Sequence, residues 1–298
     1  MGRSIVKRLI SPFYRRALRD IRLEIPNNPS LTGKFIAYDE EANAFIVEKV
    51  SAGESETAEP GLPAPVQLKN LRHTPNGLQS YLNGGKRDHE MMMKILADAG
   101  FYIQPGQVIL DFGCSTARIL RWFKEDAEKA EFWGVDIHAG DITWCKMNLS
   151  PPFRFATTTT QPHLPFEDNT FDLIYAGSLF THIDDQADSW FLELRRVMKP
   201  GALAYVTIHD QHTIDIFEDR LKDSPTGKFL AADENYQAYI RRPYAVFTVG
   251  RSIGSQVFYD REWLLRQLGD VFEVVSVTEE AYGTFQTAIV LRKAERSC

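Results

Sequence analysis

Short apolar runs alternate with amphipathic stretches over most of the chain from residue 107 onward. The runs predict strands over 107–111, 132–136, 153–157, 171–176, 202–208, 271–278 and 285–292. The stretches between them predict helices over 116–124, 138–148, 186–198 and 260–268. Strands that alternate with helices favour a mainly parallel sheet with right-handed crossovers. Because only residues 279–284 separate the last two strands, we expect those two to form an antiparallel hairpin.

The first of these strands ends in a turn that is typical of a ligand site. The apolar run over 108–110 suits a strand buried on both faces, and Asp111 ends it. Gly113 can adopt a backbone conformation that other residues resist, and it lets a ligand come close. Ser115 and Thr116 can cap a following helix, whose N-terminus would face a ligand above the turn.

The second strand ends in another acid, Asp136, which can accept hydrogen bonds from both hydroxyls of a ribose. The two strand ends together predict a site for a nucleoside cofactor. The dinucleotide fingerprint needs three glycines, and only Gly113 is present. An acid at the head of the turn suits a cationic amino-acid tail better than a pyrophosphate.

Four stretches carry a resemblance to class I S-adenosylmethionine (SAM) methyltransferases, in the right order and spacing. They are Asp111-Phe-Gly-Cys-Ser-Thr-Ala117, Gly134-Val-Asp136-Ile137, the segment 164–175 and the segment 194–203. The similarity covers residues 78 to 293 and is to bacterial small-molecule methyltransferases. Ser115 and Ala117 stand where that family usually has glycines. The resemblance implies an α/β, Rossmann-like sheet of seven mostly parallel strands, with an antiparallel last strand and helices on both faces.

The resemblance also implies which residues bind SAM. Asp136 would hold the ribose, the Gly113 turn the methionyl end, and Thr160 with Gln161 the adenine. Tyr81 would lie over the methionine, although packing against the core explains it equally well. A polar turn is the alternative explanation for Thr160 and Gln161. The full predicted set is Tyr81, Asp111, Gly113, Cys114, Ser115, Asp136, Ile137, Thr160, Gln161, Gly177 and Ser178.

Three polar residues, His209, Asp210 and His212, directly follow the strand over 202–208. A neutral histidine can take the proton of an attacking hydroxyl as its oxygen reaches the methyl group. Asp210 could orient such a histidine. The same three residues could instead hold a divalent metal that acidifies a diol, or they are simply polar loop residues. We predict the base, without a metal.

An insertion over about 211–258 follows, at a place where similar enzymes vary their substrate lids. It contains Tyr239, Arg241, Arg242 and Tyr244. Aromatic rings suit a flat or sugar-like acceptor, and paired arginines suit a carboxylate or phosphate. We predict these four as substrate-binding residues, although a packed helix with a solvated arginine face explains them equally well.

Residues 1–76 are predicted to be an N-terminal extension to the domain over 77–298. Residues 1–24 form a basic amphipathic pattern that suits packing on the body or on a partner subunit, or contact with an anionic membrane. Residues 35–48 predict a β-hairpin. Residues 51–65 are rich in Gly, Pro, Ser and Glu, which predicts a flexible linker.

Composition narrows the class of function. The net charge is -6, which disfavours a nucleic-acid binder. The 3 cysteines lack C-x-x-C spacing, which suits a reducing compartment and not a structural zinc site. No apolar run approaches the roughly 20 residues of a membrane span, so we expect a cytoplasmic protein.

These observations predict an enzyme that transfers a methyl group from SAM to a hydroxyl of a small molecule, a sugar or glycan, or a natural product. Methylation of protein or RNA is the first alternative, and the acidic balance tells against RNA. The second is a non-catalytic binding or scaffold protein with this fold, which Ser115 and Ala117 keep open.

Overall fold

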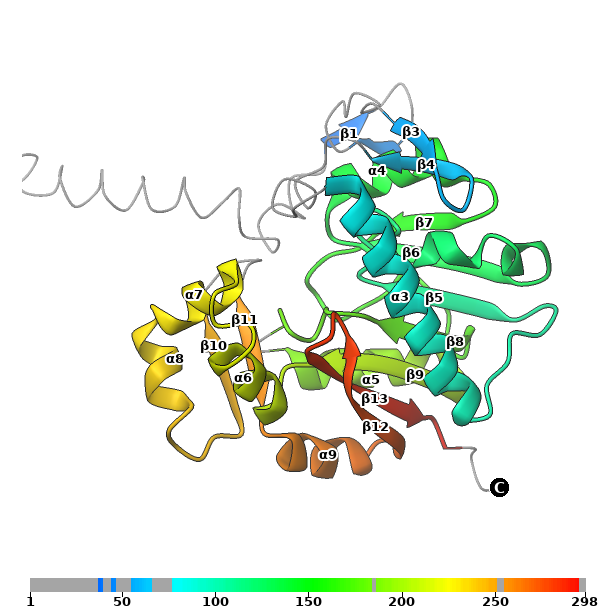
Figure 1. Ribbon diagram of the computed structural model, residues 1–298. Coiled ribbons are helices and arrows are strands. Elements are labelled where there is room, and N and C mark those ends of the chain that lie inside the picture. The colour runs from blue at the N-terminus through cyan, green and yellow to red at the C-terminus, as the bar shows by residue number, and fades with distance from the viewer. Residues whose placement is uncertain are drawn as a thin grey trace, which may run out of the picture.

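The computed structural model describes residues 37–39, 44–46, 55–65, 77–183, 186–250 and 255–294. Its centre is a 7-stranded sheet in the order β12-β13-β9-β8-β5-β6-β7 (Figure 1). The strands β5 to β9 pair in parallel, and β13 is antiparallel to both β9 and β12. The predicted Rossmann-like sheet with an antiparallel last strand is therefore confirmed. The strands are β5 (Val108–Phe112), β6 (Glu131–Asp136), β7 (Arg154–Thr157), β8 (Phe171–Ala176), β9 (Met198–Ile208), β12 (Glu273–Tyr282) and β13 (Gln286–Arg292).

Helices cover both faces of this sheet. One face carries α3 (Gly77–Asp98) and α4 (Ala139–Leu149), and the other carries α5 (Ala187–Val197) and α9 (Arg261–Gly269). Both faces are covered because successive side chains of each strand point to opposite faces. In β5, Ile109 packs in the core under α3 and α4, and Leu110 packs in the core under α5 and α9. The carboxyl ends of the parallel strands meet at one edge, where open α/β sheets bind their ligands.

The helix predicted over 116–124 is wrong. This stretch and the residues after it form two short 3-10 helices, Leu120–Phe123 and Asp126–Glu128. The backbone of Ala117 is left-handed, with a φ of 61°. A left-handed residue cannot lie inside an α-helix, so the chain leaves the turn in tighter coils.

Helix α3 begins at Gly77, which places Asp88 in the middle of the helix. The Asp88 side chain is only 2% exposed. Its carboxylate accepts a hydrogen bond from Arg118, which explains how a charged group is tolerated in that position.

The N-terminal part forms two hairpins. Strands β1 (Ala37–Asp39) and β2 (Ala44–Ile46) pair antiparallel, as the sequence predicts. The flexible linker predicted over 51–65 is wrong, because β3 (Ser55–Ala58) and β4 (Leu62–Pro65) form a second hairpin there. The basic segment 1–24 lies outside the described residues, and the domain boundary at residue 76 stays a prediction.

Between β9 and α9 the chain forms a small unit over 211–259, which we call the lid. Its core of buried side chains is separate from the two cores of the sheet and consists of Ile214, Phe217, Leu230, Tyr236, Phe247, Val249 and Phe258. Figure 1 shows the lid beside the sheet, with α8 on the side that faces away from it. The lid elements are α6 (Gln211–Glu218), α7 (Pro225–Ala231), α8 (Glu234–Tyr239), β10 (Val246–Val249) and β11 (Gln256–Tyr259).

No helix in the described part of the chain combines the length and the apolar composition needed to cross a membrane.

Candidate functional site

The turn after β5 is fixed to the neighbouring strand. The N–H groups of Gly113 and Cys114 both donate to the carbonyl of Val135, at 2.8 and 3.0 Å. Gly113 has a φ of 86°, and Ser115 and Ala117 follow it with values of 45° and 61°. Left-handed backbone costs a non-glycine residue roughly 1–2 kcal/mol. Ser115 and Ala117 therefore follow the path expected of the missing glycines, at the cost of some strain.

Asp136, at the end of β6, holds the other side of this turn. One carboxylate oxygen accepts from the Ser115 N–H and the other from the His138 N–H, each at 2.8 Å. Burial raises the pKa of Asp136, and the two N–H groups oppose that rise. A carboxylate offers about four acceptor positions, so two remain for the hydroxyls of a ribose.

The end of β7 lies next to Asp136. The Thr158 N–H donates to the Asp136 carbonyl at 2.9 Å, and this brings the following residues to the same edge. Thr160 is half-buried there, and Gln161 is exposed. The structure thus joins the start of the segment that carries Thr160 and Gln161 to Asp136, and their contact with a cofactor stays a prediction.

The opposite side of the turn is lined by residues from α3 and from the end of β8. The buried Tyr81 hydroxyl donates to the carbonyl of Thr116 at 2.8 Å. Gly177 and Ser178 follow β8, and a Cβ atom added at Gly177 would collide with the ring of Tyr282. Tyr282 therefore forms a wall of the site that the sequence patterns do not indicate.

Asp111 has an unusual protonation state. Its carboxyl is buried at the end of β5, and burial raises its pKa to about 8. The folded protein therefore holds it largely protonated at neutral pH. A cationic group placed beside it would favour the ionised form.

A family model described as a methyltransferase domain matches residues 110–206, from β5 to β9. Over residues 110–206 the chain therefore carries a methyltransferase domain of the class I SAM-dependent family. SAM is the cofactor of this domain family. The matched range contains Asp111, Gly113, Asp136 and Gly177, which are four of the predicted cofactor residues.

Two curated relatives illustrate the similarity. The methyltransferase is 34% identical over 111 residues to the sterol 24-C-methyltransferase of Schizosaccharomyces pombe, over 34% of this chain and 27% of that protein. It is 27% identical over 161 residues to the ubiquinone/menaquinone biosynthesis C-methyltransferase of Desulfotalea psychrophila, over 52% of this chain and 64% of that protein. The chain thus matches less than two thirds of the length of either relative.

Two solved structures share the fold. A SAM-dependent methyltransferase of Methanosarcina mazei superposes with a TM-score of 0.50 at 20% identity, over 68% of this chain and 98% of that one. A protein of Pyrococcus horikoshii superposes with a TM-score of 0.52 at 17% identity, over 76% and 100%. At these identities the likeness shows the architecture.

The residues of this methyltransferase suit the chemistry of SAM. The free acceptor positions of Asp136 match the ribose hydroxyls, and the buried Asp111 matches the amino group of the methionyl end. When SAM binds, it supplies a sulfonium whose methyl carbon is electrophilic. The individual roles of these residues, and of Cys114, Ile137 and Ser178, stay predictions.

His209 lies in an aromatic enclosure at the end of β9. Its ring centroid is 5.1 Å from that of Phe258, 5.8 Å from Phe285 and 6.2 Å from Phe217. Neither ring nitrogen has a hydrogen-bond partner, and the side chain is buried. Burial lowers its pKa to about 3, so the ring is neutral but only weakly basic.

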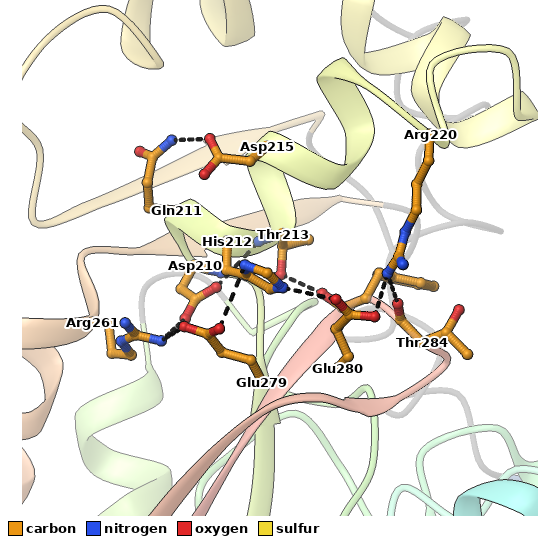
Figure 2. Close-up of polar contacts among 11 residues, drawn as sticks. Asp210, Gln211, His212, Thr213, Asp215, Arg220, Arg261, Glu279, Glu280 and Thr284 are labelled. Carbon is orange, nitrogen blue, oxygen red and sulfur yellow. Dashed lines mark hydrogen bonds and ion pairs between the residues drawn. The ribbon is translucent and has the colours of Figure 1, made fainter.

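The other two predicted catalytic residues point elsewhere. The Asp210 carboxylate caps α6 by accepting from the Thr213 N–H at 3.2 Å, and it also accepts from Arg261. The His212 ring lies between two glutamates of the β12–β13 hairpin (Figure 2). Since the three side chains do not converge, they do not form the metal site that the spacing allowed.

The four predicted substrate residues lie in the outer part of the lid. Tyr239 stacks on Phe247 at 5.2 Å, and Tyr244 meets the same ring edge-on at 4.7 Å. Arg241 and Arg242 are exposed just after α8. Burial raises the pKa of the Tyr244 hydroxyl, and the carboxylate of Asp210, just after β9, lies close enough to raise it further. A role of the four residues in acceptor binding stays a prediction.

Two polar residues that the sequence patterns did not indicate also support the site. The Asp141 carboxylate accepts from the Ser115 hydroxyl at 2.9 Å. The Gln286 amide accepts from Thr207 at 2.7 Å and donates to the Ser178 hydroxyl at 2.8 Å. Asp141 was within reach of sequence reasoning, because it lies in the first turn of the helix after Asp136. Gln286 is 108 residues from Ser178, so no local signal joins them.

Proposed function

We propose that this chain transfers the methyl group of SAM to a hydroxyl of an uncharged small molecule. The observation that carries the proposal is the junction of Ser115 and Asp136. The Ser115 N–H donates to the Asp136 carboxylate at 2.8 Å, which holds the glycine-poor turn against the acid that would bind the ribose. A chain that had lost its cofactor would have no need to maintain two strained residues in this turn.

The protein's part in the reaction is to bind and to orient. Asp136 would hold the ribose, and Asp111 would accept from the methionyl amino group. The lid would exclude water from the ends of β8 and β9 while the acceptor oxygen lies in line with the methyl group. Two lid contacts support that placement, since the Val257 N–H donates to the Thr181 carbonyl at 2.9 Å and Tyr259 to Phe180 at 3.1 Å.

An uncharged acceptor is supported by the surroundings of β9. His209 is neutral there and is enclosed by phenyl rings, which disfavour a carboxylate or phosphate. The curated relatives described above are named for a sterol and for ubiquinone/menaquinone biosynthesis, which are consistent with a small acceptor. We propose that His209 accepts a hydrogen bond from the acceptor hydroxyl.

The test is calorimetric titration with SAM and with its demethylated product, S-adenosylhomocysteine (SAH). We expect micromolar binding of both by the wild-type protein. Asp136→Ala removes a charged hydrogen-bond acceptor, which is worth roughly 1.5–3 kcal/mol, so affinity should fall about 10- to 100-fold. Asp270→Ala is the matched control, because Asp270 is exposed at the end of α9, away from the strand ends.

Transfer itself is then measured with methyl-labelled SAM and neutral hydroxylated acceptors, including a sterol, a quinol and a simple phenol. Label recovered in an organic extract would support the proposal. Failure of the folded wild-type protein to bind either SAM or SAH would contradict it and favour a scaffold role.

A further inference from the structure

The turn of the β12–β13 hairpin binds the cofactor side of the molecule. We call residues 279–285 the hairpin turn. The Tyr282 hydroxyl accepts a hydrogen bond from Arg118 at 2.5 Å, and the Gly283 N–H donates to Asp88 at 3.2 Å. Arg118 also donates to Asp88 at 2.8 Å, and the Tyr282 ring lies against Gly177. One side of the hairpin turn is therefore fixed to α3 and to the wall of the proposed SAM site.

The other side of the hairpin turn binds the lid, as Figure 2 shows. Glu280 Oε1 is 3.1 Å from His212 Nε2, and Glu279 Oε2 is 3.6 Å from His212 Nδ1. Arg220, just after α6, donates to the second oxygen of Glu280 and to the Thr284 carbonyl. Charged groups thus join the hairpin turn to both ends of α6.

Further contacts tie the first turn of α6 to the same place. The Thr213 hydroxyl donates to the Phe285 carbonyl at 2.6 Å. Arg261, at the start of α9, donates to Glu279 at 2.6 Å and to Asp210 at 3.3 Å. Because Asp210 caps α6, this arginine links the helix start to the hairpin turn.

The backbone of the hairpin turn is strained. Glu280 and Thr284 are left-handed, with φ values of 55° and 69°, and the pairing register shifts between Thr278 and Tyr282. Such residues keep their conformation only when surrounding contacts hold them. Here the contacts come from the lid on one side and from Asp88 and Arg118 on the other.

We propose that the hairpin turn couples the lid to the cofactor site, so that SAM binding and closing of the lid favour each other. This rests on the proposed function, since it needs SAM at Gly177. Glu280 and Tyr282 are two residues apart, so a shift of the Tyr282 ring moves the backbone that carries Glu280. Ion pairs between partly exposed side chains contribute little to stability. The lid is therefore held weakly enough for a ligand to change its equilibrium.

Hydrogen exchange of the full-length protein, with and without SAH, tests the coupling. In the wild-type protein we expect SAH to slow exchange of the amides of α6 at least about fivefold, the lower end of ordinary allosteric coupling. Glu280→Asn keeps a residue that tolerates left-handed backbone but withdraws the carboxylate from His212 and Arg220. SAH should then bind at least about fivefold more weakly and no longer protect α6. Arg220→Gln should act in the same direction.

Asp215→Asn is the matched control, because Asp215 lies on α6 and its carboxylate bonds to Gln211 of the same helix. It should respond to SAH as the wild-type protein does. If SAH protects the turn at Gly113 but leaves α6 unchanged, or if Glu280→Asn still shows full protection of α6, the coupling is wrong while the proposed function stands. Absence of SAH binding by the folded wild-type protein would overturn both.

Discussion

Strained residues gather at the carboxyl ends of the strands. Of the 6 non-glycine residues with positive φ in the described part of the chain, only Asn169 lies elsewhere. The other five are Ser115, Ala117, Ser178, Glu280 and Thr284. Each costs roughly 1–2 kcal/mol, which the packed sheet beneath them supplies. Strain of this kind is typical of sites that bind ligands.

Ala117 allows this strain to be measured. Ala117→Gly should change the free energy of unfolding by no more than about 1 kcal/mol, because relief of strain is offset by the lost methyl group and by unfolded-state entropy. Ala117→Val should cost about 2 kcal/mol or more, since a β-branched residue resists positive φ and the site is fully buried. Urea unfolding of the three proteins gives the comparison. Equal stability of the two variants would contradict a left-handed backbone here.

His209 should make the fold sensitive to acid. Its pKa is about 3 in the folded protein and about 6.5 when unfolded, so below pH 6.5 the unfolded state binds the extra proton. Stability should therefore rise with pH across this window, by about 2 kcal/mol between pH 5 and pH 7. Burial also lowers the pKa of His89, so the informative quantity is the difference from His209→Phe. That variant should lose this contribution, and an unchanged pH dependence would count against a buried neutral His209.

Residues of the site could be predicted from the sequence where they lie at the end of one strand, but not where their contacts join distant parts of the chain. Asp111 and Asp136 lie at the ends of β5 and β6, and Gly113 directly follows β5, so strand and turn patterns indicate all three. The neighbours of Tyr282 are different, because its contact with Arg118 spans 164 residues and depends on how the whole sheet closes. The different surroundings of His209 and His212 depend on the fold in the same way. The His209 ring lies among phenyl rings and the His212 ring lies between Glu279 and Glu280, and no local pattern shows this.

At the scale of elements, the β3–β4 hairpin depends on one buried arginine. Arg121 is fully buried, and its guanidinium donates to the carbonyls of Glu59, Leu62 and Pro63 at 3.0–3.2 Å. A charge can be buried in this way when hydrogen bonds replace its water. The hairpin is thus attached to the segment that follows the proposed SAM site.

Arg121→Met should release this hairpin. Losing the charged hydrogen bonds to three carbonyls should cost about 3 kcal/mol, and the amides of β3 and β4 should exchange faster. Lys124→Met is the control, because Lys124 reaches only the exposed end of the hairpin, at Pro60 and Gly61. It should cost about 1 kcal/mol. Similar losses in both variants would mean that Arg121 does not carry the attachment.

The sequence predicts the strands of the sheet, but it does not predict the hairpin that packs against it. Strand β8 begins at Phe171 and ends at Ala176, as the apolar run indicates. The composition of the β3–β4 hairpin predicts a linker, because its Pro and Gly content masks the residues that it buries, Leu62, Ala64 and Pro65. Composition over a short window cannot show that a distant arginine will bind those carbonyls.

At the scale of the molecule, the two sheet cores and the lid core do different work. The cores on either side of the sheet fix the positions of the strand ends. The lid core stabilises the lid, which lies beside the sheet. The hairpin turn and the Thr181–Val257 contact join these units. The proposed coupling therefore runs through the end of β12 and needs no change in the parallel strands β5 to β9.

The separate core of the lid has a consequence for how such an enzyme can diversify. Seven side chains of the lid pack on one another in a cluster of their own, so they can be substituted together while the two sheet cores keep their packing. Evolution can then exchange one lid for another while the SAM-binding residues stay the same. A chimera in which residues 211–259 are exchanged for the equivalent segment of a relative would prefer a different acceptor and would keep the same SAM site.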